Sequence, residues 1–437
     1  MSETRQHRPT LALATIGHHR HGKTTLCAAI STVLARRRPD EVRAVTVAQL
    51  DARSGRQAVA LGSGRVLRTG LPGEPLEPGS ESLTTAPSEL RYATAQRSFI
   101  HIDSPGRRPW LKNAARAQGI VDALILVVSA PDGVQAQTHE HLLLAQALGL
   151  RQLVVFLGKC DLVQDGEWLD LVEHDVRELL SRCGFDGDAT RIVRGAALPV
   201  CAGESPWEAS IADLIEALET ELTVPQLRAE GAPLLYIERV FSRRPGLEGV
   251  IVDGRVSRGQ LRRGDALWLV GFGESSRVVV AEIETQRRKV AQVGAGEFAG
   301  VLLTRSGAPL RPRDLRSGQA LVEPMTRATE LLRARVELLP TAEGGRRTAV
   351  RDGHLVSLLF GATVVSGRLR LGAPARIEPG GAAELGIELV APVYVEAGMR
   401  FLVRDGNQGP VAARGAPALW GGTAGRGELV GVAPITR

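Results

Sequence analysis

Gly17-His18-His19-Arg20-His21-Gly22-Lys23-Thr24 decides the fold of the first part of the chain, because it fits the phosphate-binding pattern G-x-x-x-x-G-K-[ST]. The apolar run at 11–16 predicts a buried strand before it, and apolar residues at helical spacing over 26–34 predict a helix after it. Glycines let such a loop turn its N–H groups toward phosphate oxygens, and the helix adds the positive end of its dipole. In this pattern Lys23 reaches the outer phosphates and the Thr24 hydroxyl binds magnesium. The alternative is a Gly/His-rich turn before an ordinary helix, which the flanking strand and helix disfavour. The candidate nucleotide-binding residues here are Gly17, His18, His19, Arg20, His21, Gly22, Lys23, Thr24 and Thr25.

The composition is that of an ordinary globular protein. A length of 437 residues predicts about three domains, and 43% hydrophobic with 23% charged residues is unremarkable for a soluble chain. Aromatic residues make up only 4%, which argues against platforms that stack on single-stranded nucleic acid. A net charge of +6 is compatible with a phosphate-rich partner but carries little weight. The four cysteines show no paired metal spacing, and we find no signal peptide or membrane-length apolar run. We therefore expect a cytoplasmic protein with free thiols.

A second candidate element follows the strand predicted at 98–102, which ends in Asp103-Ser104-Pro105-Gly106. An Asp at the carboxyl end of a parallel strand beside a phosphate loop can hold magnesium through water. The backbone N–H of Gly106 can then bind a terminal phosphate. By itself Asp-x-Pro-Gly is a common turn, and its position one β-unit after the phosphate loop gives it meaning. The intervening segment at about 39–95 is rich in Gly, Ser, Pro and Thr, so we predict a long functional or mobile loop.

A purine site is predicted where the buried strand at 153–157 ends in Gly158-Lys159-Cys160-Asp161. The stem of Lys159 can lie over a purine, and the Asp161 carboxylate can accept from the N1–H and amino group of guanine, an edge that adenine lacks. Alone, these two residues would more simply be a solvated loop pair. The apolar strand at 123–128, helices at about 137–148 and 167–182, a short strand near 192–193 and a loop containing Ala196, Ala197 and Leu198 complete an alternating β/α pattern. This pattern predicts a doubly wound domain whose ligand lies at the carboxyl ends of its strands.

Together these blocks resemble the translational GTPases, and among them the elongation factor Tu family. The segment 15–26 matches the family pattern T-I-G-H-V-D-H-G-K-T-T-L, and His101-Ile102-Asp103-Ser104-Pro105-Gly106 is a second block. A third block runs from 125–128 through Asp132-Gly133, Gln137-Thr138 and Glu140-His141. The resemblance covers nearly the whole chain except about 37–95. It implies an α/β P-loop GTPase domain with a doubly wound, mostly parallel sheet, followed by two antiparallel β-barrels. It also implies GTP/GDP and Mg²⁺ as cofactors and hydrolysis of GTP to GDP and phosphate.

The chain departs from the family pattern in its nucleotide site. The family has Asn at the position of Gly158, where it braces the phosphate loop and touches the purine. It has Ser at Ala196, whereas the Ala197 N–H that would meet guanine O6 is retained. It has an acidic residue at Arg20. These differences predict weaker nucleotide affinity or base selectivity.

A further departure concerns hydrolysis. At Arg107 the family has the His that positions the attacking water, so Arg107 and Gly106 are the candidate catalytic residues. Arginine can stabilise transition-state charge but positions water poorly, which predicts slow hydrolysis. Thr84 aligns with the magnesium-binding Thr of the family's first switch segment. The candidate metal ligands are therefore Thr24, Thr84 and Asp103.

Beyond about residue 225, helical periodicity gives way to short strands between glycine turns, which predicts β-barrels. We predict a GTP-binding domain at 1–225, a barrel at 226–326 for the aminoacylated 3′ end of tRNA, and a barrel at 327–437 for the tRNA stem. By resemblance, Glu284 lies by the terminal adenine, Phe241 and Phe298 border the amino-acid pocket, and Arg346 lies in a turn suited to a phosphate backbone. Both Phe residues could instead be core residues, and the turn a solvated hairpin. The segment 409–437 extends beyond the family's usual end and suggests no function.

The leading interpretation is a diverged Tu-like protein that delivers aminoacyl-tRNA to the ribosome during translation elongation. It implies aminoacyl-tRNA and the ribosome as partners, a nucleotide-exchange factor as a further candidate, and a monomer without membrane association. The alternative is a catalytically weak or silent paralogue that acts as a regulator or decoy, which the departures at Arg20, Arg107 and Gly158 favour. A selenocysteine-specific factor is disfavoured because no further domain follows the second barrel. The GTPase subunit of a sulfate-activating enzyme is disfavoured by the Tu-like block Glu343-Gly344-Gly345-Arg346.

Overall fold

The computed structural model describes residues 8–50, 89–103, 121–203, 206–225, 229–241, 248–285, 288–307, 309–326, 328–341, 347–360, 363–372, 375–396, 399–405 and 423–432. Contacts divide these residues into two units, one ending at 225 and the other beginning at 229. The finer division into three domains stays a prediction. Within the described residues, no helix combines the length and apolar character needed to cross a membrane.

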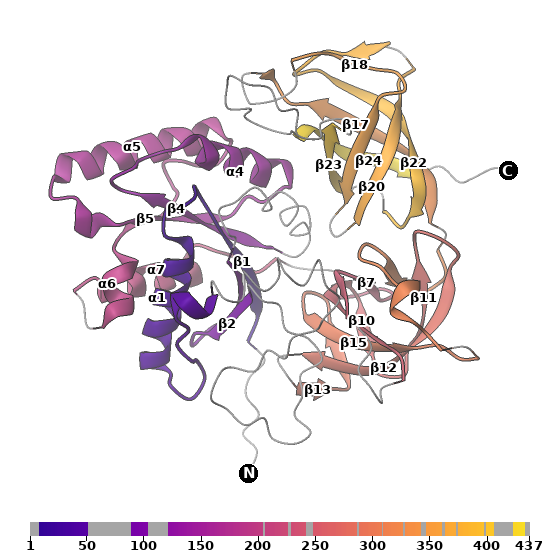
Figure 1. Ribbon diagram of the computed structural model, residues 1–437, viewed down its shortest axis with the longest axis horizontal. Helices are drawn as coiled ribbons and strands as arrows, with labels where there is room; N and C mark the ends of the chain where they lie inside the picture. Colours follow the sequence, from indigo (N-terminus) through magenta and orange to yellow (C-terminus); the bar gives the residue numbers. More distant parts are fainter. Residues whose placement is uncertain are drawn as a thin grey trace. The chain divides into compact units, whose positions relative to one another are not determined.

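The first unit is built around a mostly parallel sheet. Its elements are β1 (Thr10–Ile16), α1 (Lys23–Arg37), β2 (Glu89–Ala93), β3 (Ser98–Ile102), β4 (Ala123–Ser129), α4 (Ala136–Ala147), β5 (Leu153–Gly158), the 3-10 turn η1 (Cys160–Leu162), α5 (Gly166–Arg182), β6 (Ile192–Arg194), α6 (Ala197–Ala202) and α7 (Glu208–Thr220). The strand order is β2-β3-β1-β4-β5-β6, and only the edge strand β2 runs antiparallel to its neighbour. Figure 1 shows α4 and α5 on one face of the sheet and α1, α6 and α7 on the other. The predicted doubly wound domain is confirmed.

The central strands are buried on both faces, as their continuous apolar sequences predict. Every residue of β4 is buried. Alternate residues of β1, β4 and β5, such as Leu13, Ile125 and Phe156, join a core with α1 and α7. Because parallel strands end at one edge of the sheet, this packing brings the residues that directly follow β1, β3, β4 and β5 to that edge.

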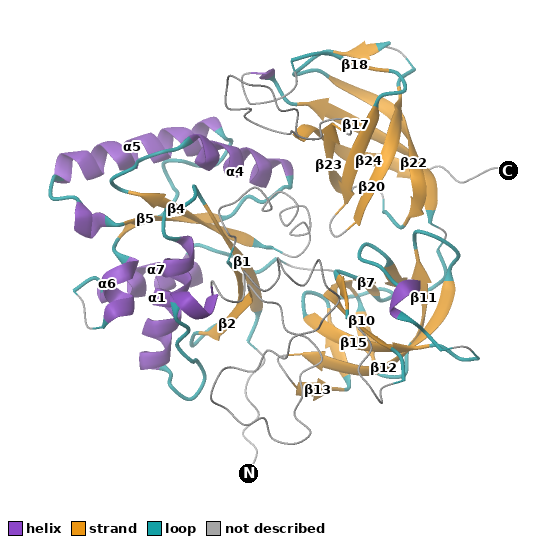
Figure 2. Ribbon diagram, viewed as in Figure 1, coloured by secondary structure: helices purple, strands orange, loops and turns teal. Residues whose placement is uncertain are grey.

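The second unit consists of β-strands joined by loops and short 3-10 turns, so every α-helix of the described residues lies in the first unit (Figure 2). Its first elements are β7 (Leu234–Tyr236), β8 (Arg239–Val240), β9 (Val250–Arg258), β10 (Gln260–Arg262), β11 (Ala266–Val270), β12 (Ser276–Thr285), β13 (Arg288–Val290), β14 (Gln292–Gly294), β15 (Phe298–Thr304), η2 (Pro312–Asp314) and β16 (Ala320–Val322). The strands pair in the order β11-β16-β7-β9-β15-β12-β13, and β11 also pairs with β12, which curls the sheet back on itself. This is the first of the two predicted barrels.

The second barrel closes through a strand to which the sequence suggested no role. Its elements are β17 (Thr329–Leu338), β18 (Val350–Arg351), β19 (Leu355–Phe360), β20 (Thr363–Arg370), β21 (Arg376–Ile377), β22 (Ala382–Val393), β23 (Arg400–Asp405) and β24 (Thr423–Val432). The ring runs β17-β22-β20-β19-β23-β24. The ring is completed only when β24 pairs with both β23 and β17. Part of the segment 409–437 is therefore structural.

Candidate functional site

The predicted phosphate loop joins β1 to α1 at the carboxyl edge of the sheet. Gly17 has φ 133°, and a Cβ there would lie 2.1 Å from the Val127 carbonyl oxygen, so only glycine fits. Gly22 has φ 93° and is the N-cap of α1, whose first bond runs from the Leu26 N–H to the Gly22 carbonyl (2.8 Å). Arg20 is exposed with φ 65°, a conformation that non-glycine residues rarely adopt. The backbone therefore curls as the motif requires.

Lys23 lies inside this loop. Its Nζ donates to the carbonyl oxygens of Gly17 (3.0 Å) and His18 (2.6 Å), and the residue is only 5% exposed. Burial lowers the pKa of Lys23 to about 8, although the nearby Asp103 carboxylate acts in the opposite direction. The ammonium group is thus held at the centre of the loop, where this motif binds phosphate.

Two of the three predicted metal ligands are brought together. Thr24 Oγ1 donates to Asp103 Oδ2 (2.8 Å), and Thr15 Oγ1 donates to Asp103 Oδ1 (3.4 Å). A hydroxyl beside a buried carboxylate is a hard oxygen donor set that suits Mg²⁺. Among the described residues no three His, Cys, Asp or Glu side chains form a metal cluster, so these residues offer no rival site of that kind. Thr84, the third predicted ligand, lies outside the described residues, as do Gly106 and Arg107.

The predicted purine segments also meet. Lys159 directly follows β5 with φ 60°, and its Nζ is 3.4 Å from Asp132 Oδ2. The Cys160 N–H donates to the Gly195 carbonyl (3.1 Å), which joins the segment with Lys159 and Asp161 to the one with Ala196. Asp161 is exposed, as a base-contacting carboxylate must be. The prediction of a loop over Ala196, Ala197 and Leu198 is wrong in part, because α6 already begins at Ala197 and Leu198 lies 67% exposed in its first turn.

Sequence reasoning missed three contacts that hold the phosphate loop from outside, two made by side chains and one by a backbone N–H group. Gln137 Oε1 accepts from the His19 N–H (2.9 Å), and His141 Nδ1 accepts from the Gly17 N–H (3.1 Å). Ser129, the last residue of β4, donates its N–H to His21 Nδ1 (3.2 Å). Gln137 and His141 belong to the third block of the resemblance, and their spacing of four residues on a predicted helix was the available signal.

The histidines around the loop act as neutral groups. Burial lowers the pKa of His21 to about 4 and the pKa of His141 to about 3. His101, whose pKa burial lowers to about 3, lies behind Asp103 with its ring nitrogens 3.1 Å from Tyr92 Oη and 3.6 Å from Cys27 Sγ. All three rings are uncharged at neutral pH, so they fix geometry without adding positive charge to the loop.

In the second unit, the predicted aminoacyl residues share one face of the first barrel. Phe298 on β15 pairs with Arg255 on β9, and Glu284 on β12 pairs with Gly300 on β15. Since cross-strand partners and residues two apart point to one face, Glu284 and Phe298 lie together, away from the core. Glu284 is buried, and the Arg255 guanidinium lies 5.5 Å from the centre of the Phe298 ring.

Phe241 continues this face at the end of β8. The ring packs beside the small cluster of Ile251 and Leu302, which is separate from the main core of the barrel. The guanidinium of Arg239, which pairs with Asp253, lies 5.5 Å from the ring centre. Arg346, predicted to contact the tRNA stem, lies outside the described residues.

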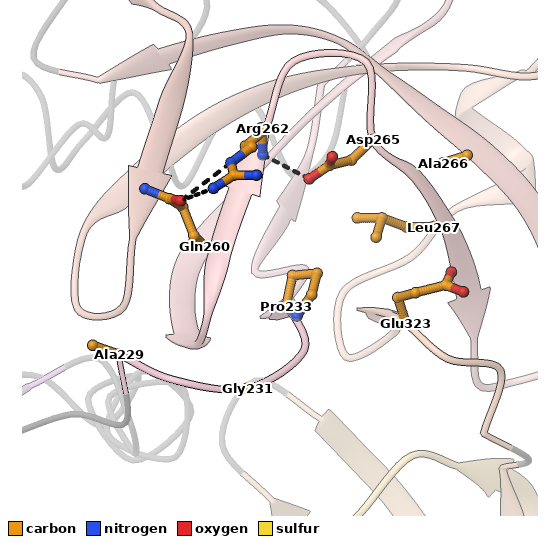
Figure 3. A pocket seen from close by; sticks show the side chains of 9 residues that line it. All are labelled: Ala229, Gly231, Pro233, Gln260, Arg262, Asp265, Ala266, Leu267 and Glu323. Carbon is orange, nitrogen blue, oxygen red and sulfur yellow. Dashed lines mark hydrogen bonds between the residues drawn. The ribbon is translucent and has the colours of Figure 1, made fainter.

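A hollow of about 430 Å³ in the second unit involves none of the predicted residues. Figure 3 shows apolar residues such as Pro233 and Leu267 in its lining, together with three polar residues that bond to each other: Gln260 accepts from the Arg262 side chain, and Asp265 accepts from the Arg262 N–H. Glu323, which also lines the hollow, pairs with Arg277 (2.7 Å), and we assign the hollow no role.

Comparison with protein families agrees with both units. Residues 8–223 match the model of the elongation factor Tu GTP binding domain, and residues 325–414 match the model of the elongation factor Tu C-terminal domain. The matches cover more than two thirds of the chain. The first spans the phosphate loop and both purine segments, and the second spans the last barrel up to β23. The chain therefore belongs to the elongation factor Tu family of translational GTPases.

Proposed function

We propose that this protein binds GTP with Mg²⁺, carries aminoacyl-tRNA to the ribosome in the cytoplasm, and hydrolyses GTP more slowly than an ordinary family member. The observation that supports the proposal most directly is the contact of Thr24 with Asp103 beside the buried Lys23. A buried ammonium group that would bind phosphate thus lies near two oxygen-bearing side chains that would bind magnesium.

The chain's own residues would divide the work. Backbone N–H groups of the loop and Lys23 would bind the outer phosphates, and Lys159 with Asp161 would bind guanine. A magnesium ion held by Thr24 and Asp103 would neutralise charge on the terminal phosphates. Binding free energy from these groups would position the terminal phosphoryl group, since phosphoryl transfer depends mainly on positioning and charge stabilisation.

Slow hydrolysis is proposed from Arg107. Its guanidinium could stabilise charge but is a poor positioner of the attacking water. The test is single-turnover GTP hydrolysis with programmed ribosomes by the wild type and by Arg107→His. We expect the variant to be faster. A wild-type rate equal to that of an ordinary elongation factor Tu would refute this part of the proposal.

Delivery of tRNA is proposed from the barrel face that carries Phe241, Glu284 and Phe298. Native-gel binding with charged and uncharged tRNA in GTP tests it, because a carrier must prefer the charged form. A protein that binds guanine nucleotides but does not distinguish the two tRNAs would support the alternative, a regulator or decoy. The departures from the family pattern at Arg20, Arg107 and Gly158 favour that alternative.

Nucleotide binding comes first in this series. Titrations with mant-GTP and mant-GDP, with ATP as competitor and with or without Mg²⁺, should show magnesium-dependent binding that prefers guanine. Absence of binding at micromolar protein would refute the proposed function.

A further inference from the structure

One segment of the first unit contacts both halves of the predicted nucleotide site. It runs from Asp132, in the loop after β4, to His141 on α4. On the purine side Asp132 pairs with Lys159 (3.4 Å). On the phosphate side Gln137 and His141 accept hydrogen bonds from the loop backbone. The proposed function gives none of these three acceptors a role.

The phosphate side of this contact is specific in geometry. Gln137 and His141 lie four residues apart, so they share one face of α4. They accept from the N–H groups of His19 and Gly17, which fixes two peptide planes in the first half of the loop. An acceptor at His141 Nδ1 requires an unprotonated ring, and burial keeps this ring neutral.

The loop that leads into α4 is itself held in one conformation. The N–H groups of Asp132 (3.2 Å) and Gly133 (2.8 Å) donate to the Ser129 carbonyl, and Gln135 Nε2 donates to the Asp132 carbonyl (2.6 Å). Trp168 Nε1 at the start of α5 donates to the Ala130 carbonyl (3.0 Å). Because the turn is fixed by these hydrogen bonds, a shift of α4 moves Asp132, and a shift of Asp132 moves α4.

We propose that the segment 132–141 sets the position of the phosphate loop relative to Lys159, the lysine predicted to contact the purine. Gln137, His141 and Asp132 then act as positioning residues for guanine nucleotides. This inference rests on the proposed binding of GTP and GDP. The three contacts differ in strength. Gln137 and His141 satisfy backbone donors at the foot of the loop, whereas the Asp132–Lys159 pair is half exposed and screened by solvent.

The test is the dissociation rate of mant-GDP, with its preference over mant-ADP, measured on the full chain. Each of the substitutions Gln137→Met and His141→Ala leaves a loop N–H without its acceptor, so we expect each variant to release mant-GDP roughly five- to 100-fold faster. The preference of these two variants for GDP over ADP should not change, because Lys159 keeps its ion pair with Asp132. Asp132→Asn should accelerate release at most about fivefold but should lower the preference for GDP.

Two controls separate positioning from general loss of structure. His141→Asn places an amide oxygen near the position of Nδ1, so it should restore a rate within about twofold of wild type, taking twofold as about 0.4 kcal/mol. His174→Ala removes an exposed histidine from the neighbouring helix α5 and should change nothing. Unchanged release by Gln137→Met and His141→Ala would overturn the inference and leave the proposed function intact. Equal impairment of His141→Asn and His141→Ala would also overturn it. A wild-type protein that binds no guanine nucleotide would overturn both.

Discussion

Replacing Gly158 with Asn should tighten guanine-nucleotide binding, because the position has room for a side chain. Gly158 is the last residue of β5, and its φ is not in the left-handed region. A Cβ there would lie 3.3 and 3.4 Å from two ring carbons of Phe156 and 3.8 Å from the Val128 carbonyl oxygen. A shift of the ring by a few tenths of an ångström accommodates it. The fold therefore does not require glycine at this position, although the family has Asn there.

The substitution acts separately on the stability of the fold and on the affinity for the nucleotide. Removing glycine from a strand end stabilises the folded chain by about 0.5–1 kcal/mol, which offsets the tight contact with Phe156. One added hydrogen bond to the purine is worth about 0.5–1.5 kcal/mol net. That corresponds to a roughly two- to tenfold lower Kd for GDP, with little change in thermal stability.

The assay is mant-GDP titration of wild type, Gly158→Asn and Gly158→Ala. The alanine variant adds the same Cβ without the amide, so it should bind like the wild type. Gly195→Ala tests the spatial argument itself, since its Cβ would lie 2.4 Å from Ser210 Oγ and 2.8 Å from Phe156, and we expect it to lower the melting temperature. Equal affinities for folded Gly158→Asn and Gly158→Ala would refute the reasoning.

Three further predictions concern charge. Asp103→Asn should weaken GTP binding about tenfold or more in Mg²⁺ but much less in EDTA, because it removes the negative charge of the carboxylate that we propose holds Mg²⁺ beside Thr24; mant-GTP titration checks this. The pKa of Lys23 in the folded protein is about 8, below its ordinary value. The affinity for GDP should therefore be highest below pH 8 and fall roughly tenfold between pH 7 and 9, because the ammonium charge is lost. An affinity that stays constant in titrations across this range would contradict the prediction. His101 has a pKa of about 3 when folded and about 6.5 when unfolded, so its stabilising contribution is complete above pH 6.5 and is lost as the pH falls toward 3. Urea unfolding of the helical unit is followed by circular dichroism at about 222 nm. The His101 contribution to the free energy of unfolding should fall by about 2 kcal/mol between neutral pH and pH 5, and His101→Asn should lack this decrease.

The sequence predicted those parts of the molecule that depend on local pattern. Continuous apolar runs marked β4 and β5, and the loop motif predicted the strand before it and the helix after it, because strand, loop and helix are adjacent along the chain. β24 was missed because its sequence, Thr423–Val432, contains three glycines and little alternation. Its role depends on pairing with β17, about a hundred residues earlier in the chain.

The contacts of Gln137 and His141 were missed for a related reason. Each joins positions more than a hundred residues apart, and neither residue type marks a phosphate site by itself. A helical spacing of four shows which residues share a face but not which loop that face meets. Tertiary structure alone supplies the second half of that information.

The retained and altered residues differ in how they act, and this bears on the choice between carrier and silent paralogue. The phosphate half depends on backbone conformation at Gly17 and Gly22 and on the Lys23 and Thr24 side chains, all of which match the family motif. The altered Arg20 projects an exposed side chain from a left-handed backbone, a conformation that costs roughly 1–2 kcal/mol without disturbing the loop's hydrogen bonds. At Gly158 the chain lacks the side chain that the family has beside the purine, but the strand itself is intact, because Gly158 on β5 still pairs with Ser129 on β4. Affinity should therefore be retained through the phosphates while base selectivity weakens, so ATP should compete better here than in a protein with the family's Asn. A silent paralogue that had lost its switch would instead lose the phosphate half, and magnesium dependence with it.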